Sequence, residues 1–263
     1  MSAAMPPGPI VLLTDFGDRD PYVGIVKGAI LSGAPKARLV DLCHGLAPQD
    51  VRAAALALRM AAPYFPAGSL FVAVVDPGVG SARRILWARS RRQQFLAPDN
   101  GVLSWLAGGD ALVELRSVEN EKYFLSSSSA TFHGRDRFAP VAAALSRGLS
   151  PARLGPRVDD AARWPWPEPR SSAAALSGVV LSFDRFGNAV TNLPSARVPE
   201  GARVVHRTRD LGPLRSHYAE VPPGRALAVA GSAGLVELCA RQADFRARFR
   251  AKTGDPVHVR HRR

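Results

Sequence analysis

The chain has few cysteines and no hydrophobic run long enough to cross a membrane. Only Cys43 and Cys239 occur among its 263 residues, so neither a disulfide framework nor a cysteine zinc site is expected. No window approaches the roughly 20 apolar residues that span a bilayer. The first residues, MSAAMPPGPI, lack the charged-then-apolar order of a signal peptide. We therefore expect a cytoplasmic protein that does not act in a membrane.

Lysine is scarce as well, and this affects how the net charge of +13 is interpreted. Clustered basic residues would favour nucleic-acid binding, because they neutralise phosphates and release counterions. Here 31 of the 35 basic residues are Arg and only four are Lys, and most are scattered along an Ala- and Pro-rich chain. This distribution is typical of a compositional bias. Specific nucleic-acid binding is not expected, and the basic tail from Arg246 to Arg263 is expected to be solvated.

The sequence does contain a regular alternation of short β-branched runs and amphipathic stretches, from Ile10 to about Arg147. Strands are predicted at 10–15, 38–42, 70–76, 85–88, 94–97 and 112–115, and helices at 22–31, 50–60, 102–106 and 138–145. Alternation of this kind is typical of βαβ units. It predicts an α/β domain with a mostly parallel sheet.

The composition changes between Pro151 and Ser177, where Pro, Trp, Ser and Ala occur without periodicity. Beyond this stretch, strands are predicted at 178–183, 189–192, 203–206 and 227–230, and a final helix near 236–250. We therefore predict an N-terminal α/β domain over residues 1–170, a linker over 171–177 and a smaller β-rich domain over 178–263.

Four short motifs place charged or hydrogen-bonding side chains beside a glycine: TDFGDRD at 14–20, VVDPGVGSARR at 74–84, FHGRD at 132–136 and DRFGN at 184–188. In the second motif, Asp76 ends an apolar strand and a glycine-rich turn leads to Arg83. Such strand ends are where α/β proteins place their reactive groups. If His133 of the third motif lies nearby, the three side chains could hold a water between a proton acceptor and a permanent positive charge.

Each motif also has a structural interpretation. The carboxylates at 15, 18 and 20 could compensate the dipole of a helix that starts near Pro21. A single histidine is more often a structural hydrogen bonder than a catalyst, and Gly187 could simply turn a hairpin.

Metal binding is a third possibility, because six residues of metal-ligating type occur in or near these motifs: Asp15, Asp20, His44, Asp76, His133 and Asp136. Metal hydrolases usually show tighter signatures, such as a His-x-x-x-His helix, and this chain has none. No metal is therefore expected.

Taken together and in this order, the four motifs resemble those of the S-adenosyl-L-methionine hydroxide adenosyltransferase family, which is related to the fluorinase and the chlorinase. The likeness runs from about Ile10 to Ala243. It implies hydrolysis of S-adenosyl-L-methionine to adenosine and L-methionine, by attack of water or hydroxide at the ribose C5′. The water-activating trio of the family corresponds to Asp76, Arg83 and His133. S-adenosyl-L-methionine is then the substrate, and the resemblance implies no cofactor.

The resemblance also implies how substrate is bound and how the protein is built. The implied binding residues are Asp15 for the ribose; Asp20, Tyr22, Asp184 and Ser232 for the methionine end; Phe186 and Asn188 for the adenine; and in addition Gln49 and Phe132. The implied fold is an α/β domain followed by a β-barrel-like domain. The implied assembly is a homotrimer, with each site formed by the first domain of one subunit and the second domain of its neighbour.

Three departures favour the hydrolase over a halogenase. The halogenases have Tyr in place of Asp76 and Ser in place of Gly134, and the fluorinase carries an insertion near residues 89–93, where this chain is short. The chain also departs from the family pattern Asn-Ser-x-Gly-Tyr, since it reads GSAGL at 231–235. A halide-using 5′-halo-5′-deoxyadenosine synthase and a non-catalytic adenosine-binding protein are the alternatives.

Overall fold

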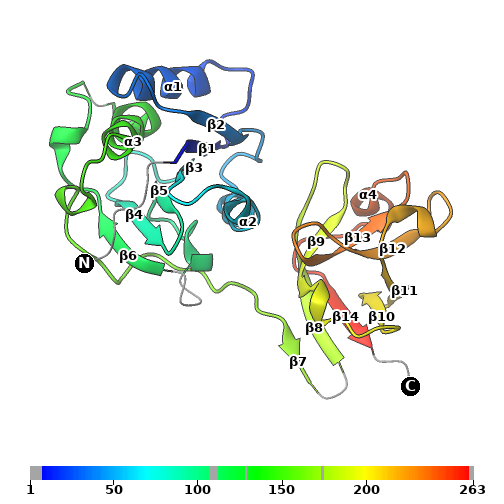
Figure 1. Cartoon of the computed structure of the whole chain (residues 1–263). Coiled ribbons are helices and arrows are strands. Elements are labelled where there is room, and N and C mark those ends of the chain that lie inside the picture. The colour runs from blue at the N-terminus through cyan, green and yellow to red at the C-terminus, as the bar shows by residue number, and fades with distance from the viewer. Residues whose placement is uncertain (1–7, 107–111, 128, 173–174, 261–263) are drawn as a thin grey trace. The chain divides into compact units, whose positions relative to one another are not determined.

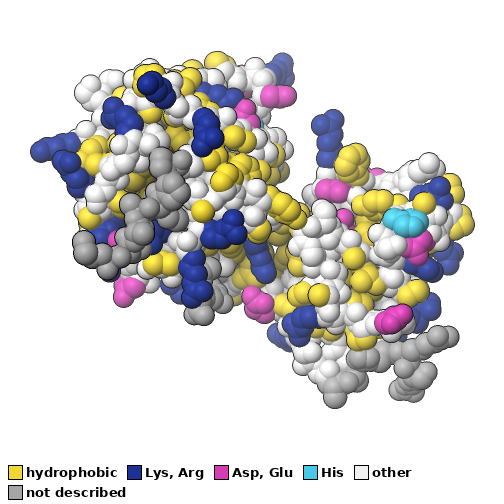
Figure 2. Space-filling view, viewed as in Figure 1, with side chains coloured by type: hydrophobic (Ala, Val, Ile, Leu, Met, Phe, Trp, Pro, Cys, Tyr) yellow, Lys and Arg dark blue, Asp and Glu magenta, His cyan; other side chains and the backbone are white. Residues whose placement is uncertain are grey.

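The computed structural model describes residues 8–106, 112–127, 129–172 and 175–260, and the chain divides into two compact units, Met1–Trp166 and Pro167–Arg263 (Figure 1). Each unit encloses its own hydrophobic core. None of the helices in the described part of the chain combines the length and the hydropathy that crossing a membrane requires. Figure 2 shows Lys and Arg side chains spread over the visible face of both units, interspersed with apolar and acidic ones.

The N-terminal unit is built on a six-stranded sheet with the order β2-β1-β3-β5-β4-β6. The strands are β1 (Ile10–Thr14), β2 (Leu39–Cys43), β3 (Leu70–Val74), β4 (Ile85–Ser90), β5 (Gln94–Pro98) and β6 (Leu112–Ser117). β4 pairs antiparallel with both of its neighbours, and the other pairings are parallel. The predicted mostly parallel sheet is confirmed.

Helices cover both faces of this sheet (Figure 1): α1 (Tyr22–Gly33) and α3 (Ala139–Ser146) one face, and α2 (Val51–Ala61) the other. Alternate strand residues point to opposite faces. Accordingly Ile10 and Leu12 belong to the core beneath α1 and α3, while Val11 and Leu13 belong to the core beneath α2. Burial on both sides explains the continuous apolar run of β1.

The C-terminal unit is a closed β-barrel. Its strands follow the order β14-β10-β11-β12-β13-β9-β8, and pairing of β14 with β8 closes the ring. They are β8 (Ala175–Phe183), β9 (Ala189–Pro194), β10 (Arg203–His206), β11 (Arg209–Arg215), β12 (Ala226–Ala230), β13 (Leu235–Ala240) and β14 (Pro256–Arg260). The barrel-like domain implied by the resemblance is confirmed.

Two predicted helices differ from the structure. Only Ser104–Leu106 of the stretch 102–106 is helical, as a single 3₁₀ turn. The helix predicted near 236–250 is right only in its last part: β13 occupies the first part, because Val236, Leu238 and Ala240 alternate into the barrel core. The short helix α4 (Phe245–Phe249) follows, capped by the Asp244 carboxylate on the Ala247 N–H.

The stretch 171–177, expected as a linker, carries regular structure at both ends. β7 (Arg170–Ser171) pairs antiparallel with the first residues of β8, and β8 begins at Ala175. Residues 173–174 lie outside the described residues.

Candidate active site

The candidate site of the N-terminal unit lies at the carboxyl edge of its sheet. β1 and β3 are parallel neighbours with Thr14 opposite Val74, so Asp15 and Asp76 emerge at the same edge. The connection from β1 through α1 and the connection into β3 through α2 run on opposite faces of the sheet. This is a topological switch point, the position where open α/β sheets bind their ligands.

Asp76 and Arg83 form a buried ion pair at this edge. Arg83 donates from Nε to Oδ1 of Asp76 over 2.8 Å and from Nη2 to Oδ2. The two side chains are only 9% and 5% exposed for Arg83 and Asp76 respectively. Fork-to-fork pairing of this kind fixes both groups in one orientation.

His133 completes the trio from the residue just before the π-helix that leads into α3. Arg83 Nη2 lies 2.9 Å from His133 Nδ1. A guanidinium only donates, so Nδ1 must be the acceptor and the ring proton must sit on Nε2. Burial, with the nearby charges of Arg137 and Arg83, lowers the pKa of His133, in agreement with a neutral ring. The structure thus brings together the three residues predicted as catalytic.

One N–H donor of Arg83 is not used by its hydrogen bonds to the described residues. A guanidinium carries five N–H groups. Nε and one Nη2 hydrogen bind Asp76, the other Nη2 hydrogen faces His133, and one Nη1 hydrogen faces the Arg84 carbonyl at 3.4 Å. The second Nη1 hydrogen has no partner among the described residues, so it can bind a water or an anion.

The turn between Asp76 and Arg83 is shaped by its small residues. Ser81 Oγ accepts the Arg83 N–H at 3.2 Å. Gly80 has a φ of 81°, and a Cβ there would lie 2.7 Å from the Ala130 carbonyl oxygen. Only glycine combines this backbone with this close approach. The loop that carries the arginine therefore packs against the loop that leads to His133.

A short π-helix, Gly134–Phe138, follows His133 and precedes α3. Such wide turns occur often at functional sites. Within it, the fully buried Asp136 accepts hydrogen bonds from the backbone of Ser129 at 2.6 Å and from Arg135 Nε at 2.5 Å. Burial alone would raise the pKa of Asp136, but these two donors outweigh it and the pKa is lowered. Asp136 therefore fixes the loop in front of His133 as an anion.

The first motif presents its carboxylates in two ways. Asp15 Oδ2 accepts the backbone N–H of Gln49 at 2.7 Å, and Gln49 has a left-handed backbone with a φ of 66°. Asp20 is exposed, just before α1. The N-cap of α1 is Pro21, with no side-chain capping bond at this described helix start, so capping does not account for Asp20.

Tyr22 and Phe132 belong to an aromatic cluster that sequence reasoning did not complete. With Phe16 they form three edge-to-face pairs with centroid distances of 5.3–5.9 Å. A Cβ on Gly134 would lie 3.4 Å from Phe132 and 3.5 Å from Phe16, so this glycine leaves room next to the rings. No spacing in the sequence signalled Phe16, because Phe132, which completes the cluster, comes from a distant segment.

In the C-terminal unit, the turn between β8 and β9 brings three predicted residues together. Asp184 Oδ1 accepts the N–H groups of Phe186 and Asn188, and its Oδ2 accepts the Asn188 side-chain amide at 2.9 Å. Gly187 has a φ of 80° and packs against Asp244. The turn leaves the Phe186 ring 76% exposed. An exposed ring above a rigid turn suits stacking with a planar base.

Glu237 is a site candidate that the sequence reasoning missed. Its half-buried carboxylate lies against Gly231, in the loop that also carries the exposed Ser232. Burial, followed by the negative charge of Asp184, raises the pKa of Glu237, and burial with nearby negative charges raises the pKa of Tyr218 to about 12. Asp184 and the Ser232 loop are therefore connected through one acidic environment.

The residues considered for a metal do not form a metal site. Over the described ranges of the chain, no three His, Cys, Asp or Glu side chains come close enough to hold an ion together. His133 faces Arg83, and Asp15 is engaged by a backbone N–H.

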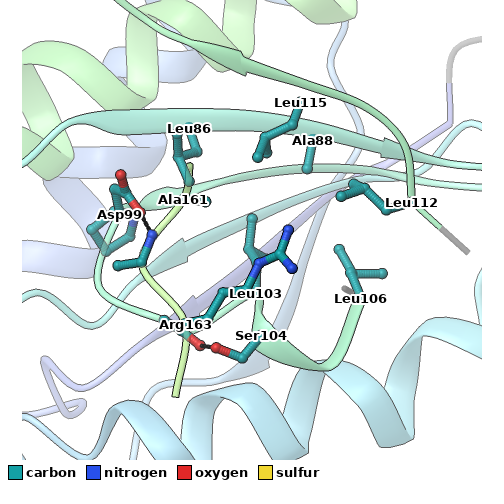
Figure 3. A pocket seen from close by; sticks show the side chains of 13 residues that line it. Leu86, Ala88, Asp99, Leu103, Ser104, Leu106, Leu112, Leu115, Ala161 and Arg163 are labelled. Carbon is teal, nitrogen blue, oxygen red and sulfur yellow. Dashed lines mark hydrogen bonds between the residues drawn. The ribbon is translucent and has the colours of Figure 1, made fainter. Parts of the chain in front are cut away.

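A small pocket lies beside Asp99, but it is too small for a substrate. Its volume is about 20 Å³, and one water needs roughly 10–15 Å³. Figure 3 shows mainly aliphatic side chains around it, with the Asp99 carboxylate bonded to the Ala162 N–H at 2.7 Å. The labelled aliphatic residues are Leu86, Ala88, Leu103, Leu106, Leu112, Leu115 and Ala161.

Comparisons with known proteins agree with this architecture. Residues 10–155 match the model of the SAM hydroxide adenosyltransferase N-terminal domain, and residues 178–258 that of the C-terminal domain. The chain is 42% identical to the (R)-S-adenosyl-L-methionine hydrolase of Thermus thermophilus, over 95% of this chain and 99% of that protein. It is 29% identical to a fluorinase from an Actinoplanes species, over 70% of this chain and 71% of the fluorinase.

A crystal structure of an uncharacterized conserved protein from Thermotoga maritima is similar over nearly the whole chain. Its TM-score is 0.88 at 34% identity, and the match covers 96% of this chain and all of that one. Both domain models, the order of the motifs and both folds thus agree. The chain belongs to the SAM hydroxide adenosyltransferase family, which is related to the fluorinases.

Proposed function

We propose that this protein hydrolyses (R)-S-adenosyl-L-methionine to adenosine and L-methionine, with Asp76, Arg83 and His133 as its catalytic residues. The observation that carries the proposal is the buried Asp76–Arg83–His133 constellation at the switch point of the sheet. The hydrolase of Thermus thermophilus, which this chain matches over nearly its whole length, supports the choice of reaction.

The chemistry requires a nucleophile more than an acid. A sulfonium is already a good leaving group, so methionine departs without protonation or a metal. The water oxygen bonds to C5′ as the C5′–S bond breaks, and the electron pair of that bond stays on the methionine sulfur. One proton of the water leaves to a base and then to solvent. General-base assistance of this kind contributes about 10²–10⁴-fold, and in-line positioning of both reactants contributes up to roughly 7–11 kcal/mol.

The hydrogen bonds favour Asp76 as the proton acceptor. His133 Nδ1 is occupied by Arg83 and Nε2 carries the proton, so the ring would have to release Arg83 before it could act as a base. Each carboxylate oxygen of Asp76 still has a second lone pair beyond its bond to Arg83. In this assignment the remaining Nη1–H of Arg83 stabilises the developing hydroxide, and His133 restrains Arg83.

Substrate binding is assigned by the family resemblance and supported by the local geometry. Asp15 is oriented by Gln49 and can accept a ribose hydroxyl, and the exposed Phe186 ring can stack on adenine with Asn188 at its edge. Tyr22 and Phe132 present an aromatic wall next to His133. We assign the methionine end to Asp20, Tyr22, Asp184 and Ser232, and place Gln49 and Phe132 among the binding residues.

We also propose that the protein works as a homotrimer, in which the N-terminal unit of one subunit and the C-terminal unit of another bind the same substrate molecule. The assigned binding residues are divided between two separate folding units, which supports a composite site. Sedimentation equilibrium tests this: a mass of three chains supports the trimer, and an active monomer rejects it.

The hydrolase assignment is tested by incubating the protein with S-adenosyl-L-methionine in ¹⁸O-labelled water, with and without chloride, and identifying products by mass spectrometry. Adenosine labelled at the 5′ oxygen is expected in both cases. A 5′-chloro-5′-deoxyadenosine product would instead establish a halogenase, and unchanged substrate would indicate a binding protein. Asp76→Asn should abolish release of adenosine, whereas Asp210→Asn, at an exposed ion pair of the barrel, serves as the matched control.

A further inference from the structure

A network of hydrogen bonds adjoins Asp15, and the functional roles proposed above do not involve it. Thr14 Oγ1, at the end of β1, lies 2.8 Å from His44 Nδ1, and His44 Nε2 lies 3.0 Å from Asp41 Oδ1 of β2. Lys27 of α1 donates to the other Asp41 oxygen over 2.6 Å. The His44 ring thus joins β1 to β2, and Asp41 extends the network to α1.

The donor and acceptor of each of these hydrogen bonds follow from the ionised carboxylate of Asp41. Burial opposes ionisation of Asp41, but its bonds to Lys27 and His44 outweigh burial and lower its pKa, so this carboxylate only accepts. His44 Nε2 therefore carries a proton. Each donor and acceptor in this network then has one partner if the Thr14 hydroxyl donates to Nδ1 of His44 and accepts the backbone N–H of Phe16, which lies 3.3 Å away.

The same histidine joins the two loops that meet at Asp15. Its ring holds Thr14, the residue directly before Asp15, and its carbonyl accepts the Gly17 N–H at 2.7 Å. Five residues further on, the Gln49 N–H binds Asp15 Oδ2 at 2.7 Å. No other hydrogen bond to the Asp15 carboxylate occurs among the described residues. Its Oδ1 is therefore available, and its direction is set by these two loops.

We infer that His44 is a positioning residue that acts through Thr14 and Asp15 to orient the carboxylate that receives the ribose hydroxyls. It does not touch substrate. The inference rests on the proposed function, in which Asp15 binds the ribose. Thr14 is only 1% exposed, so its hydroxyl cannot serve a ligand directly and its bond to His44 serves the loop. A histidine that merely stabilised the fold would affect ligands with and without ribose hydroxyls equally.

The test compares adenosine with 2′,3′-dideoxyadenosine in binding measured by calorimetry, and KM with kcat for S-adenosyl-L-methionine. His44→Phe and the nearly isosteric Thr14→Val each break the hydrogen bond between Thr14 and His44. Each should raise the Kd of adenosine and the KM of S-adenosyl-L-methionine about tenfold, the effect of one misaligned bond to a charged group. The Kd of the dideoxy compound should stay within about twofold, since its contact with Asp15 is already missing.

Three controls make the result specific. Thr14→Ser keeps the hydroxyl and should restore the adenosine Kd. Ser32→Ala removes a hydroxyl that bonds only within α1 and should change neither ligand. Adding His44→Phe to Asp15→Asn should weaken adenosine binding less than twofold further, because both changes remove the same contact. If His44→Phe does not fold, as judged by near-UV circular dichroism, Thr14→Val decides.

Equal loss of binding for adenosine and the dideoxy compound, or additive effects of His44→Phe and Asp15→Asn, would overturn the inference. Failure of the proposed function is seen separately. Wild-type protein that binds adenosine but releases none from S-adenosyl-L-methionine rejects the hydrolase, while the coupling of His44 to the ribose is still measured. If adenosine does not bind at all, the inference falls as well.

Discussion

Replacing Asp76 should separate catalysis from stability in the candidate site. The carboxylate is 5% exposed and is held by both arms of a guanidinium that is 9% exposed. Breaking a buried pair by removing one partner costs about 3–5 kcal/mol, because the other charge is left uncompensated. Asp76→Leu should therefore lower the free energy of unfolding of the N-terminal unit by that amount. Asp76→Asn keeps one acceptor oxygen and should cost about 1–3 kcal/mol.

Activity should follow a different pattern from stability in the same variants. Loss of the proposed general base should reduce kcat about 10²–10⁴-fold in both single variants. The double variant Asp76→Leu/Arg83→Met replaces the pair by apolar side chains, and such replacements of buried pairs are often neutral or stabilising by about 1–4 kcal/mol. The double variant should therefore be stable and inactive. No purely structural role for the pair predicts this combination.

The assays are urea denaturation followed by circular dichroism, and chromatographic measurement of adenosine release on the same preparations. Asp99→Asn is the control, because it disturbs the neighbouring 2.7 Å pair with Arg84 and should lower stability while most of the activity remains. The reasoning would be refuted by a double variant that hydrolyses S-adenosyl-L-methionine, or by Asp76→Asn that keeps more than a tenth of the wild-type kcat.

Three further changes test His133, the Gly80 turn and Phe186 of the barrel. Burial and the neighbouring arginines lower the pKa of His133 below 6.5, so the unfolded chain binds its proton first. The free energy of unfolding should then fall as the pH drops below 6.5 toward the folded pKa, and His133→Asn should flatten that part of a urea-denaturation profile. Gly80→Ala places an L-residue in a left-handed backbone and adds a clash with the Ala130 carbonyl. It should lower the free energy of unfolding by about 1–3 kcal/mol or more. Gly148→Ala, at a φ of 90° but in open space, carries only the backbone cost, and equal unfolding midpoints would contradict the packing argument. Phe186→Ala should change the free energy of unfolding by no more than about 0.5 kcal/mol. It should raise the KM for S-adenosyl-L-methionine about tenfold, because stacking on a base is worth about 1–3 kcal/mol. An unchanged KM would remove Phe186 from the proposed adenine site.

The sheet of the N-terminal unit was predictable because its sequence carries two clear periods. Apolar runs such as Ile10–Thr14 are buried on both faces, and the stretches between them repeat at helical spacing. The period became ambiguous in the barrel. Val236, Leu238 and Ala240 follow a strand period, but the helix-favouring residues after them led to a predicted helix. Pairing with distant strands, which decides such cases, is not visible locally.

The trio was predicted as a set from the resemblance of its motifs to the family, but its internal hydrogen bonds could not be predicted. Parallel strands end at one edge, so a motif after β3 and a motif before α3 can meet although Arg83 and His133 are 50 residues apart. Which nitrogen of His133 faces Arg83 is decided by packing around the π-helix. For the same reason sequence reasoning gave no role to the Thr14–His44 bond, which joins residues 30 positions apart.

Charge balance explains why a buried pair suits a cationic substrate. Arg83 alone would repel a sulfonium, and the repulsion would be strong because the side chain is almost fully shielded from water. Asp76 neutralises that charge, and a neutral His133 adds none. In the proposed reaction the pair can therefore orient a water and stabilise the hydroxide without opposing the substrate. A lysine in place of Arg83 would not serve in the same way, since a single ammonium cannot bind both carboxylate oxygens, reach His133 and keep a planar N–H for the nucleophile.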